Sequence, residues 1–151
     1  MTITFSSSVK RENIGRLKRL LKDRLLLFPS WLQSIEIQET VQKKENKRAN
    51  LQTLAEIHLT EYRQAIIKLF PGYFNKPLEQ SETITHELAH LPTLELLTFT
   101  ENLIADYVKD DQTKRNLKRQ LNRISEQSTQ DLTEIYERLL ETRKRNKTSV
   151  K

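Results

Sequence analysis

Apolar residues recur at helical spacing near the start of the chain. Between about Val9 and Phe28, lysines and arginines separate the apolar positions, which are Ile14, Leu17, Leu20, Leu21, Leu25 and Leu27. This spacing predicts an amphipathic helix that Pro29 ends. Residues 1–8 and the basic tail 145–151 show no such period, and we expect both ends of the chain to be flexible.

Three later runs alternate apolar and polar residues, which is typical of half-buried strands. The first is SIEIQETVQ, in which Ile35 and Ile37 share one face. The others are LAEIHL, Leu54 to Leu59, and RQAIIKLF, Arg63 to Phe70, and the short polar link between them predicts a hairpin. The polar run KKENKRAN, Lys43 to Asn50, has no hydrophobic period and is expected to be a loop.

The second half of the chain shows only helical periods. Helices are expected over about 79–91, beyond Pro92 through 94–107, and over 111–126 and 129–145. The order of one helix, three strands and then helices predicts a single α+β domain over residues 1–151. Its sheet should be small, three-stranded, and antiparallel or mixed.

Composition narrows the classes of protein that fit this pattern. With 36% hydrophobic and 30% charged residues, the chain should build a modest core beneath helices with wide solvated faces. The absence of cysteine excludes disulfides, thiolate metal sites and a cysteine nucleophile. No run approaches the ~20 apolar residues of a membrane span and no signal-peptide pattern is present, so we expect a cytoplasmic protein without membrane contact.

The net charge of +6 is unevenly distributed along the chain. Residues 1–50 carry 11 basic and 5 acidic side chains, residues 51–110 carry 4 and 9, and residues 111–151 carry 11 and 6. The basic ends alternate with acids and lack interleaved aromatics, which favours solvated helix faces over a nucleic-acid interface. A weak contact of these basic termini with nucleic acid is the alternative.

The segment SETITHELAH carries the strongest chemical signal. Residues four apart share one helix face, so His86 and His90 can direct both imidazoles at one metal ion at ~2.0 Å. Glu87 lies beside this pair, where its carboxylate can take the proton of a metal-activated water without binding the metal itself. The alternative is a surface helix with two solvated histidines. The opposite face is apolar and would anchor the helix in the core, through Ile84, Leu88 and Leu91.

HELAH and its context resemble the zincin metallopeptidases, in particular small phage and bacterial HExxH proteins of gluzincin type. The likeness runs in order from about Trp31 to Leu140 and includes the hairpin AEIHLTEYRQAIIKLFP, although only HELAH is a sharp motif. It implies a zincin-like fold, a Zn²⁺ ion bound by His86 and His90, and Glu87 as general base in the hydrolysis of a peptide or protein substrate. It also implies that RQAIIKLF or its hairpin partner borders the cleft and holds an extended peptide.

A catalytic zinc normally has three protein ligands, and HELAH supplies two. A metzincin would place a further histidine at position 96, which is Leu96 here, so that subclass is excluded. Gluzincins use a glutamate from a later helix, and we expect Glu134 in DLTEIYERLL, with Glu101 in TFTENLIADY as the alternative. Glu134 is preferred because a helix that begins just after the motif leaves Glu101 little room to turn back onto the metal.

The remaining polar side chains give weaker signals. His58 stands on the polar side of its predicted strand, which favours an exposed position over a metal ligand. A donor for the tetrahedral oxyanion is expected among the tyrosines, but the sequence does not choose between Tyr62, Tyr73, Tyr107 and Tyr136.

Two functions compete with the zinc metallopeptidase. One is a basic helical interaction or nucleic-acid-binding module in which HELAH is structural. The other is a zincin that has lost catalysis and binds a partner. Salt-dependent retention on nucleic acid that survives substitution of both histidines would favour the first.

Overall fold

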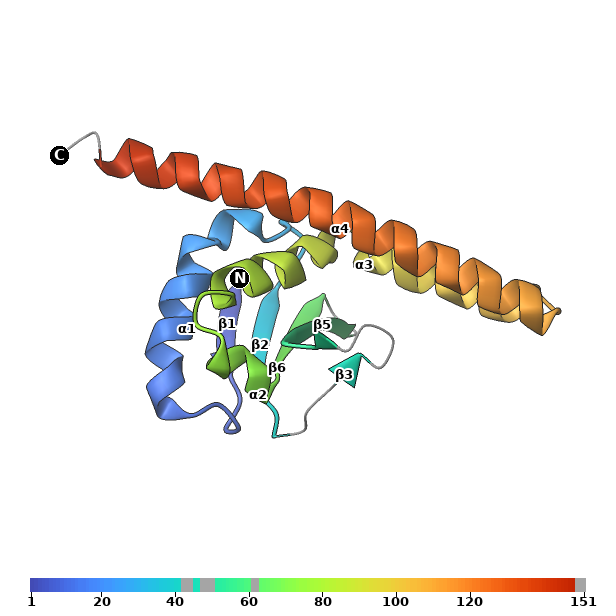
Figure 1. Ribbon diagram of the computed structural model, residues 1–151, viewed down its shortest axis with the longest axis horizontal. Helices are drawn as coiled ribbons and strands as arrows, with labels where there is room; N and C mark the ends of the chain where they lie inside the picture. Colours follow the sequence, from blue (N-terminus) through green and yellow to red (C-terminus); the bar gives the residue numbers. More distant parts are fainter. Residues whose placement is uncertain (42–44, 47–50, 61–62, 149–151) are drawn as a thin grey trace.

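The computed structural model describes residues 1–41, 45–46, 51–60 and 63–148 (Figure 1). In chain order the elements are β1 (Thr2–Phe5), α1 (Arg11–Asp23), the 3₁₀ helix η1 (Leu25–Leu27), β2 (Ser34–Glu39), β3 (Glu45–Asn46), β4 (Leu51–Gln52), β5 (Ala55–Thr60), β6 (Gln64–Leu69), α2 (Pro71–Asn75), α3 (Gln80–Tyr107) and α4 (Asp111–Thr148). The fold is therefore α+β, as the pattern of the sequence predicts.

The main sheet has four strands in the order β1-β2-β6-β5, rather than the three expected. Strands β1, β2 and β6 are parallel, and β5 runs antiparallel to β6 at one edge. The additional strand is β1, whose residues Ile3 and Phe5 are in register with Ile35 and Ile37. The expectation of a flexible segment over residues 1–8 is thus wrong for Thr2–Phe5, because four residues of alternating pattern are too short to predict a strand before its pairing partner is known.

The β5-β6 hairpin agrees with the prediction. Its register pairs Ala55 with Leu69 and Thr60 with Gln64. Arg63 enters β6 with a φ of 58°, a left-handed conformation that the turn requires. Most of the run expected to be a loop, 43–50, lies outside the described residues, but Glu45–Asn46 in it forms the short strand β3.

Helices α1 and the first half of α3 cover one face of this sheet (Figure 1). Ile35 and Ile37 of β2 and Ile67 of β6 are fully buried beneath them. The helices contribute the other half of this core, through Leu17, Leu21, Ile84, Leu88 and Leu91. Burying a side chain of this size contributes about 1.5–3 kcal/mol, so the apolar back of the HELAH segment fixes its helix firmly against the sheet.

Two long helices replace the four shorter ones predicted for the second half of the chain. Helix α3 has 28 residues and continues through Pro92, and α4 has 38 residues. A proline inside a helix loses one backbone hydrogen bond and costs about 3 kcal/mol. The packing of α3 along α4 offsets this loss, since Leu91 beside the proline is fully buried. The expected break between 126 and 129 contains no glycine or proline, so nothing there ends α4.

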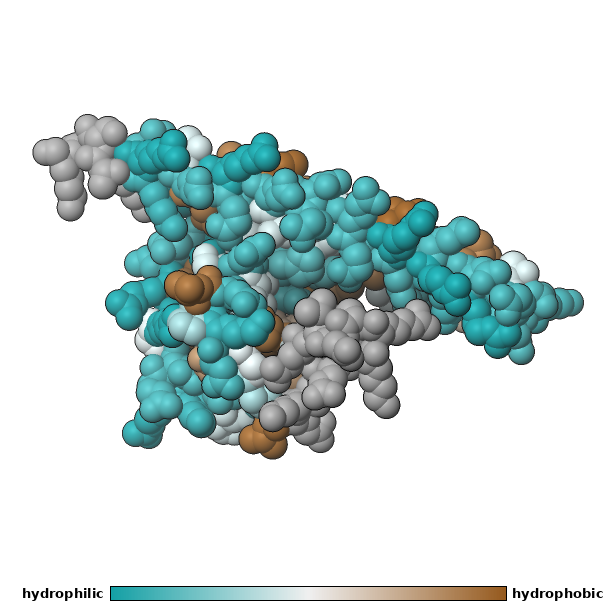
Figure 2. Space-filling view, viewed as in Figure 1, coloured by the Kyte–Doolittle hydropathy of each residue, from teal (hydrophilic) through white to brown (hydrophobic). Residues whose placement is uncertain are grey.

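The second half of α3 and the first half of α4 form a helical hairpin that projects beyond the sheet (Figure 1). The face shown in Figure 2 is mostly hydrophilic, with small separate apolar groups, several of them along α4. Neither long helix, nor any other helix in the described part of the chain, is apolar over enough residues to cross a bilayer.

Candidate metal centre

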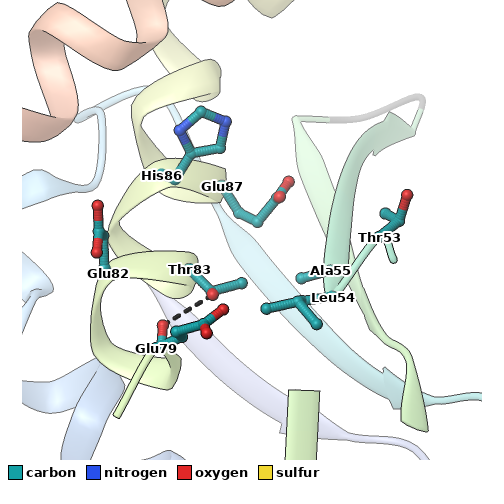
Figure 3. Close-up of a pocket in the computed structure, with 8 residues that line it drawn as sticks. All are labelled: Thr53, Leu54, Ala55, Glu79, Glu82, Thr83, His86 and Glu87. Atoms are coloured by element: carbon teal, nitrogen blue, oxygen red, sulfur yellow. Dashed lines mark hydrogen bonds between the residues drawn. The ribbon is translucent and has the colours of Figure 1, made fainter. Parts of the chain in front are cut away.

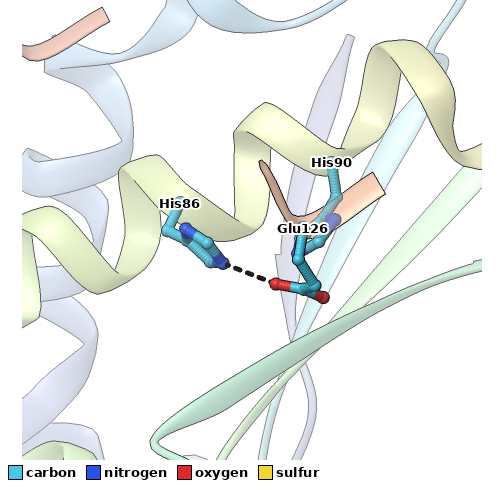
Figure 4. A group of neighbouring side chains, drawn as sticks. All are labelled: His86, His90 and Glu126. Carbon is cyan, nitrogen blue, oxygen red and sulfur yellow. Dashed lines mark ion pairs between the residues drawn. The ribbon is translucent and has the colours of Figure 1, made fainter. Parts of the chain in front are cut away.

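His86 and His90 lie on successive turns of α3 and face the same direction. Their ring centroids are 5.0 Å apart. The carboxylate of Glu126, which α4 supplies, faces both rings: its oxygens lie 3.7 Å from Nε2 of His86 and 3.9 Å from Nε2 of His90 (Figure 4). One ligand atom from each of the three residues falls within 4.8 Å of the others, and no second group of this kind occurs among the described residues. Two imidazoles and one carboxylate are a ligand set that suits a divalent zinc ion.

The structure does not bring Glu134 or Glu101 into this group. The carboxylate of Glu134 is 57% exposed and lies 3.7 Å from the guanidinium of Arg138. It points away because Thr133 already faces α3, and the next residue of a helix is rotated by about 100°. Glu101 lies about 16 Å beyond His90, because α3 continues straight through the position where a turn was expected.

Glu126 was not predicted from the sequence, although a signal for it exists. Glu126, Thr129 and Thr133 follow one another at helical spacing, so a single continuous α4 places all three on the face that meets α3. The prediction of a helix boundary after 126 hid this relation, because it assigned the glutamate and the threonines to different helices.

The hydroxyls of Thr129 and Thr133 contact the Nδ1 atoms of the two imidazoles, the nitrogens not directed at Glu126. Thr129 Oγ1 lies 3.0 Å from Nδ1 of His90, and Thr133 Oγ1 lies 3.4 Å from Nδ1 of His86. The hydroxyl of Thr133 donates its proton to the carbonyl oxygen of Thr129, so it can only accept from the imidazole of His86. Nδ1 of His86 therefore carries a hydrogen, which leaves Nε2, the atom that faces Glu126, as the nitrogen available to a metal. Metal-binding histidines are usually oriented in this way by a partner at the other nitrogen.

Glu87 points from α3 toward β5, and its side chain diverges from the imidazole of His86 (Figure 3). It is 7% exposed, and this burial raises the pKa of its carboxyl group to about 7. The negative charges of Glu126 and Glu56 add to the rise, whereas His86 and a hydrogen bond from the backbone amide of Ile57 oppose it. A carboxylate with a pKa near neutrality is suited to accept and return protons at physiological pH.

The charges of the three facing side chains are coupled. The Glu126 carboxylate raises the pKa of His86, and His86 in turn lowers the pKa of Glu126. Burial lowers the pKa of His90. The lowered pKa values favour the carboxylate form of Glu126 and the neutral form of His90, in which both groups bind a metal. The raised pKa of His86 favours a proton that would compete with the metal.

A cleft runs between β5 and the two long helices. A cavity of about 560 Å³ opens at the metal centre and is lined by Thr53, Ala55, Glu56, Ile57, His86, Glu87, His90, Leu94, Leu97, Asn122, Ser125 and Glu126. A second cavity of about 360 Å³ adjoins it toward the start of α3 (Figure 3) and shares Thr53, Ala55, His86 and Glu87. The candidate metal centre thus stands near the middle of a cleft with room on both sides.

Strand β5 forms the wall of this cleft opposite the helices. The Phe70 amide donates to the Leu54 carbonyl, and hydrogen-bonded pairs alternate along an antiparallel hairpin. Glu56, His58 and Thr60 therefore direct their backbone groups toward β6. The residues between them, Ala55, Ile57 and Leu59, direct their amide and carbonyl groups away from β6. The amide of Ile57 accordingly reaches Glu87. His58 is exposed, as predicted, and its Nε2 lies 2.9 Å from the Glu56 carboxylate.

A buried arginine fixes how α4 lies on the rest of the fold. Arg24, which is 4% exposed, donates from Nε to the Thr85 hydroxyl at 2.8 Å. It also donates to the Glu137 carboxylate of α4 at 3.3 Å and to the Ser81 carbonyl at 3.1 Å. The Thr85 hydroxyl contacts the same Glu137 carboxylate. Because Thr85 precedes His86, these contacts set the position of α4, and with it of Glu126, relative to the imidazoles.

Three of the four tyrosines considered as oxyanion donors do not reach the cleft. Tyr73 is buried, its hydroxyl lies 3.5 Å from the Gln80 carbonyl, and burial raises its pKa to about 12. Tyr107 is 78% exposed, and Tyr136 packs against the core. None of these three lines either cavity of the cleft. Tyr62 lies outside the described residues.

Comparison of the chain with protein-family models, with curated proteins and with solved structures finds no match. The resemblance to zincins therefore stays a prediction from HELAH and its context. The geometry of His86, His90, Glu126 and Glu87 is what bears on the chemistry of this site.

Proposed function

We propose that the protein is a zinc-dependent peptidase, in which His86, His90 and Glu126 hold the ion and Glu87 is the general base. The observation that carries this proposal is the meeting of Glu126, from a separate helix, with the two histidines of HELAH within 4.8 Å. Three convergent ligands beside an open cavity leave a position for water or substrate, which distinguishes catalytic zinc sites from structural ones.

The chemistry divides between the ion and Glu87. A zinc ion bound here would act as a Lewis acid, lowering the pKa of water to ~7 and polarising a carbonyl group. The Glu87 carboxylate takes a proton from the attacking water and passes it to the departing amine. Its burial and its pKa of about 7 support both transfers, because the acid and the carboxylate are then both populated near neutral pH.

The substrate that fits the cleft is an extended peptide. The outward amide and carbonyl groups of Ala55 and Leu59 offer the hydrogen bonds that add a strand to a sheet edge. A peptide paired with β5 would pass directly over Glu87, since the amide of Ile57 between them already contacts that carboxylate. The room on both sides of the centre suits an internal peptide bond more than a chain end.

Metal titration of two matched variants tests the ligand set. Glu126→Gln should weaken zinc binding by at least about 100-fold, because the neutral amide is a far poorer ligand. Glu134→Gln changes the same residue type on the same helix, where its side chain is 57% exposed, and should bind zinc like the wild type. Loss of zinc from Glu134→Gln but not from Glu126→Gln would overturn the assignment, and a wild-type chain that takes no zinc would overturn the proposed function.

A hydrolysis assay distinguishes an active peptidase from a protein that binds zinc but has lost catalysis. Glu87→Gln should keep one zinc per chain and lose cleavage of an unstructured protein such as casein by at least about 100-fold, the range typical of a lost general base. Equal cleavage by wild type and Glu87→Gln would assign the general base elsewhere.

A further inference from the structure

Ser125 stands out among the polar groups of the cleft. It is 8% exposed, and its Oγ is the one buried side-chain oxygen or nitrogen without a hydrogen-bond partner in the described part of the chain. Other buried hydroxyls in the long helices are bonded: Thr133 donates to the carbonyl of Thr129 and Thr85 to that of Ser81. Because an unpartnered buried hydroxyl destabilises a folded protein, an isolated exception points to a ligand.

Ser125 belongs to the cavity that opens at the candidate metal centre. It immediately precedes Glu126 on α4, and it lies one turn before Thr129, whose hydroxyl contacts the imidazole of His90. Ser125 lines the larger cavity of the cleft together with Asn122 and Leu94. The oxygen is thus buried and unpartnered on a residue in the wall of the cavity where a substrate would bind.

We propose that the Ser125 hydroxyl donates a hydrogen bond to the carbonyl oxygen of the scissile peptide bond and to the oxyanion that this oxygen becomes. The inference rests on the proposed function. Catalysis of acyl transfer depends on donors aimed in advance at the developing negative charge. Tyr73, Tyr107 and Tyr136 do not line the cleft, and of the neutral polar side chains that do, Ser125 alone is buried without a protein partner.

Ser125 forms no covalent bond in this step. The oxygen of water bonds to the carbonyl carbon, one proton of that water passes to Glu87, and the π electrons of the carbonyl move onto the oxygen that Ser125 contacts. When the tetrahedral carbon collapses, these electrons return, the C–N bond breaks, and the proton on Glu87 goes to the amine. The serine keeps its proton throughout, so its contribution is a hydrogen bond that strengthens as charge develops.

The first test needs neither metal nor substrate. In the metal-free protein, Ser125→Ala should raise the midpoint of thermal unfolding by roughly 2–4 °C, because it removes a buried group without a partner. Ser128→Ala is the matched control: the same residue type, one turn further along α4 and outside the cleft. A lowered midpoint in Ser125→Ala would overturn the proposal, because the hydroxyl would then have a structural partner.

The second test uses acetohydroxamate, whose carbonyl and hydroxamate oxygens bind to zinc, as a probe of the zinc-loaded protein. Ser125→Ala should bind zinc like the wild type but bind acetohydroxamate about tenfold more weakly, the effect of one lost hydrogen bond. Ser128→Ala should match the wild type in both. Unchanged acetohydroxamate affinity in Ser125→Ala would overturn the role of Ser125 and leave the proposed function standing. Absence of zinc from the wild type would overturn both the proposed function and this inference.

Discussion

The hydroxyl of Thr133 accepts a hydrogen bond from Nδ1 of His86 while it donates its own proton to the carbonyl of Thr129. A residue on α4 thereby fixes the tautomer of an imidazole on α3. The candidate metal ligand His86 and its supporting hydroxyl thus come from two helices that are joined only at the far end of a projecting hairpin.

Thr133→Val tests this support. Valine keeps the shape of threonine but cannot accept the hydrogen, so Nδ1–H of His86 would be buried without a partner. Zinc affinity should fall by about 10–100-fold, the usual effect of losing such a partner. The matched control is Thr142→Val, since the exposed Thr142 hydroxyl contacts only the Arg138 carbonyl of its own helix at 2.9 Å. Competition with a chromophoric chelator measures both affinities, and equal affinities would show that Thr133 does not orient His86.

Arg24→Ala should destabilise the fold by about 3 kcal/mol, because it leaves the Glu137 carboxylate and the Thr85 hydroxyl without their charged donor. The control is Arg138→Ala. Arg138 is 79% exposed and its ion pair with Glu134 measures 3.7 Å, so its loss should cost less than about 0.5 kcal/mol. Urea unfolding of the metal-free variants gives both free energies. Similar values for the two would contradict the role of Arg24 in docking α4.

The pH dependence of stability should reveal the buried carboxyl of Glu87. Its pKa of about 7 in the folded protein lies above the ordinary value of 4.5, so the folded state binds the proton more tightly than the unfolded chain. This contribution is complete below pH 4.5 and is lost as the pH rises through 7. The metal-free wild type should therefore lose on the order of 3 kcal/mol relative to Glu87→Gln across that interval. Parallel pH profiles of the two proteins in urea unfolding would contradict the buried position of Glu87.

Ala55→Pro tests the edge of β5 as the peptide-binding wall. The amide of Ala55 points away from β6, and proline is tolerated at the first residue of a strand, so the hairpin and the zinc ligands should remain intact. Peptide cleavage should fall by about tenfold through a higher KM, as one backbone hydrogen bond to the substrate is lost. Unchanged KM in Ala55→Pro would place the substrate elsewhere.

Sequence patterns predict those parts of the fold whose structure depends on residues close together in the chain. The spacing of His86 and His90 suffices to place both on one helix face, and the alternation in LAEIHL and RQAIIKLF suffices for the hairpin. Strand β1 escapes prediction because Thr2–Phe5 becomes a strand only through its pairing with β2. The helix end predicted at Pro92 is wrong for a related reason. The free-energy cost of a proline inside α3 is offset by packing against α4, which follows later in the chain.

The third candidate ligand, Glu126, could not be found from sequence because its position depends on the register between α3 and α4. That register is set by the contacts of Arg24 with Thr85 and Glu137, which join three separated segments. Because a helix boundary was expected near residue 126, Glu134 was predicted as the ligand. Its side chain is rotated by about 100° around α4 from Thr133, which faces α3. Helix continuity is thus the property on which the prediction of this site depended.

Because Glu126 comes from α4 and the histidines come from α3, a metal ion at this centre would also join the two helices. Helix α4 is held to the rest of the fold by apolar packing, through Leu140 and Tyr136 at the core. Threonine hydroxyls and the salt bridge of Glu137 add polar contacts. A metal ion shared by the two helices would link them, and its binding free energy would add to the stability of the folded protein. Chelation would then lower the free energy of unfolding, and zinc supply would govern the resistance of the protein to proteolysis.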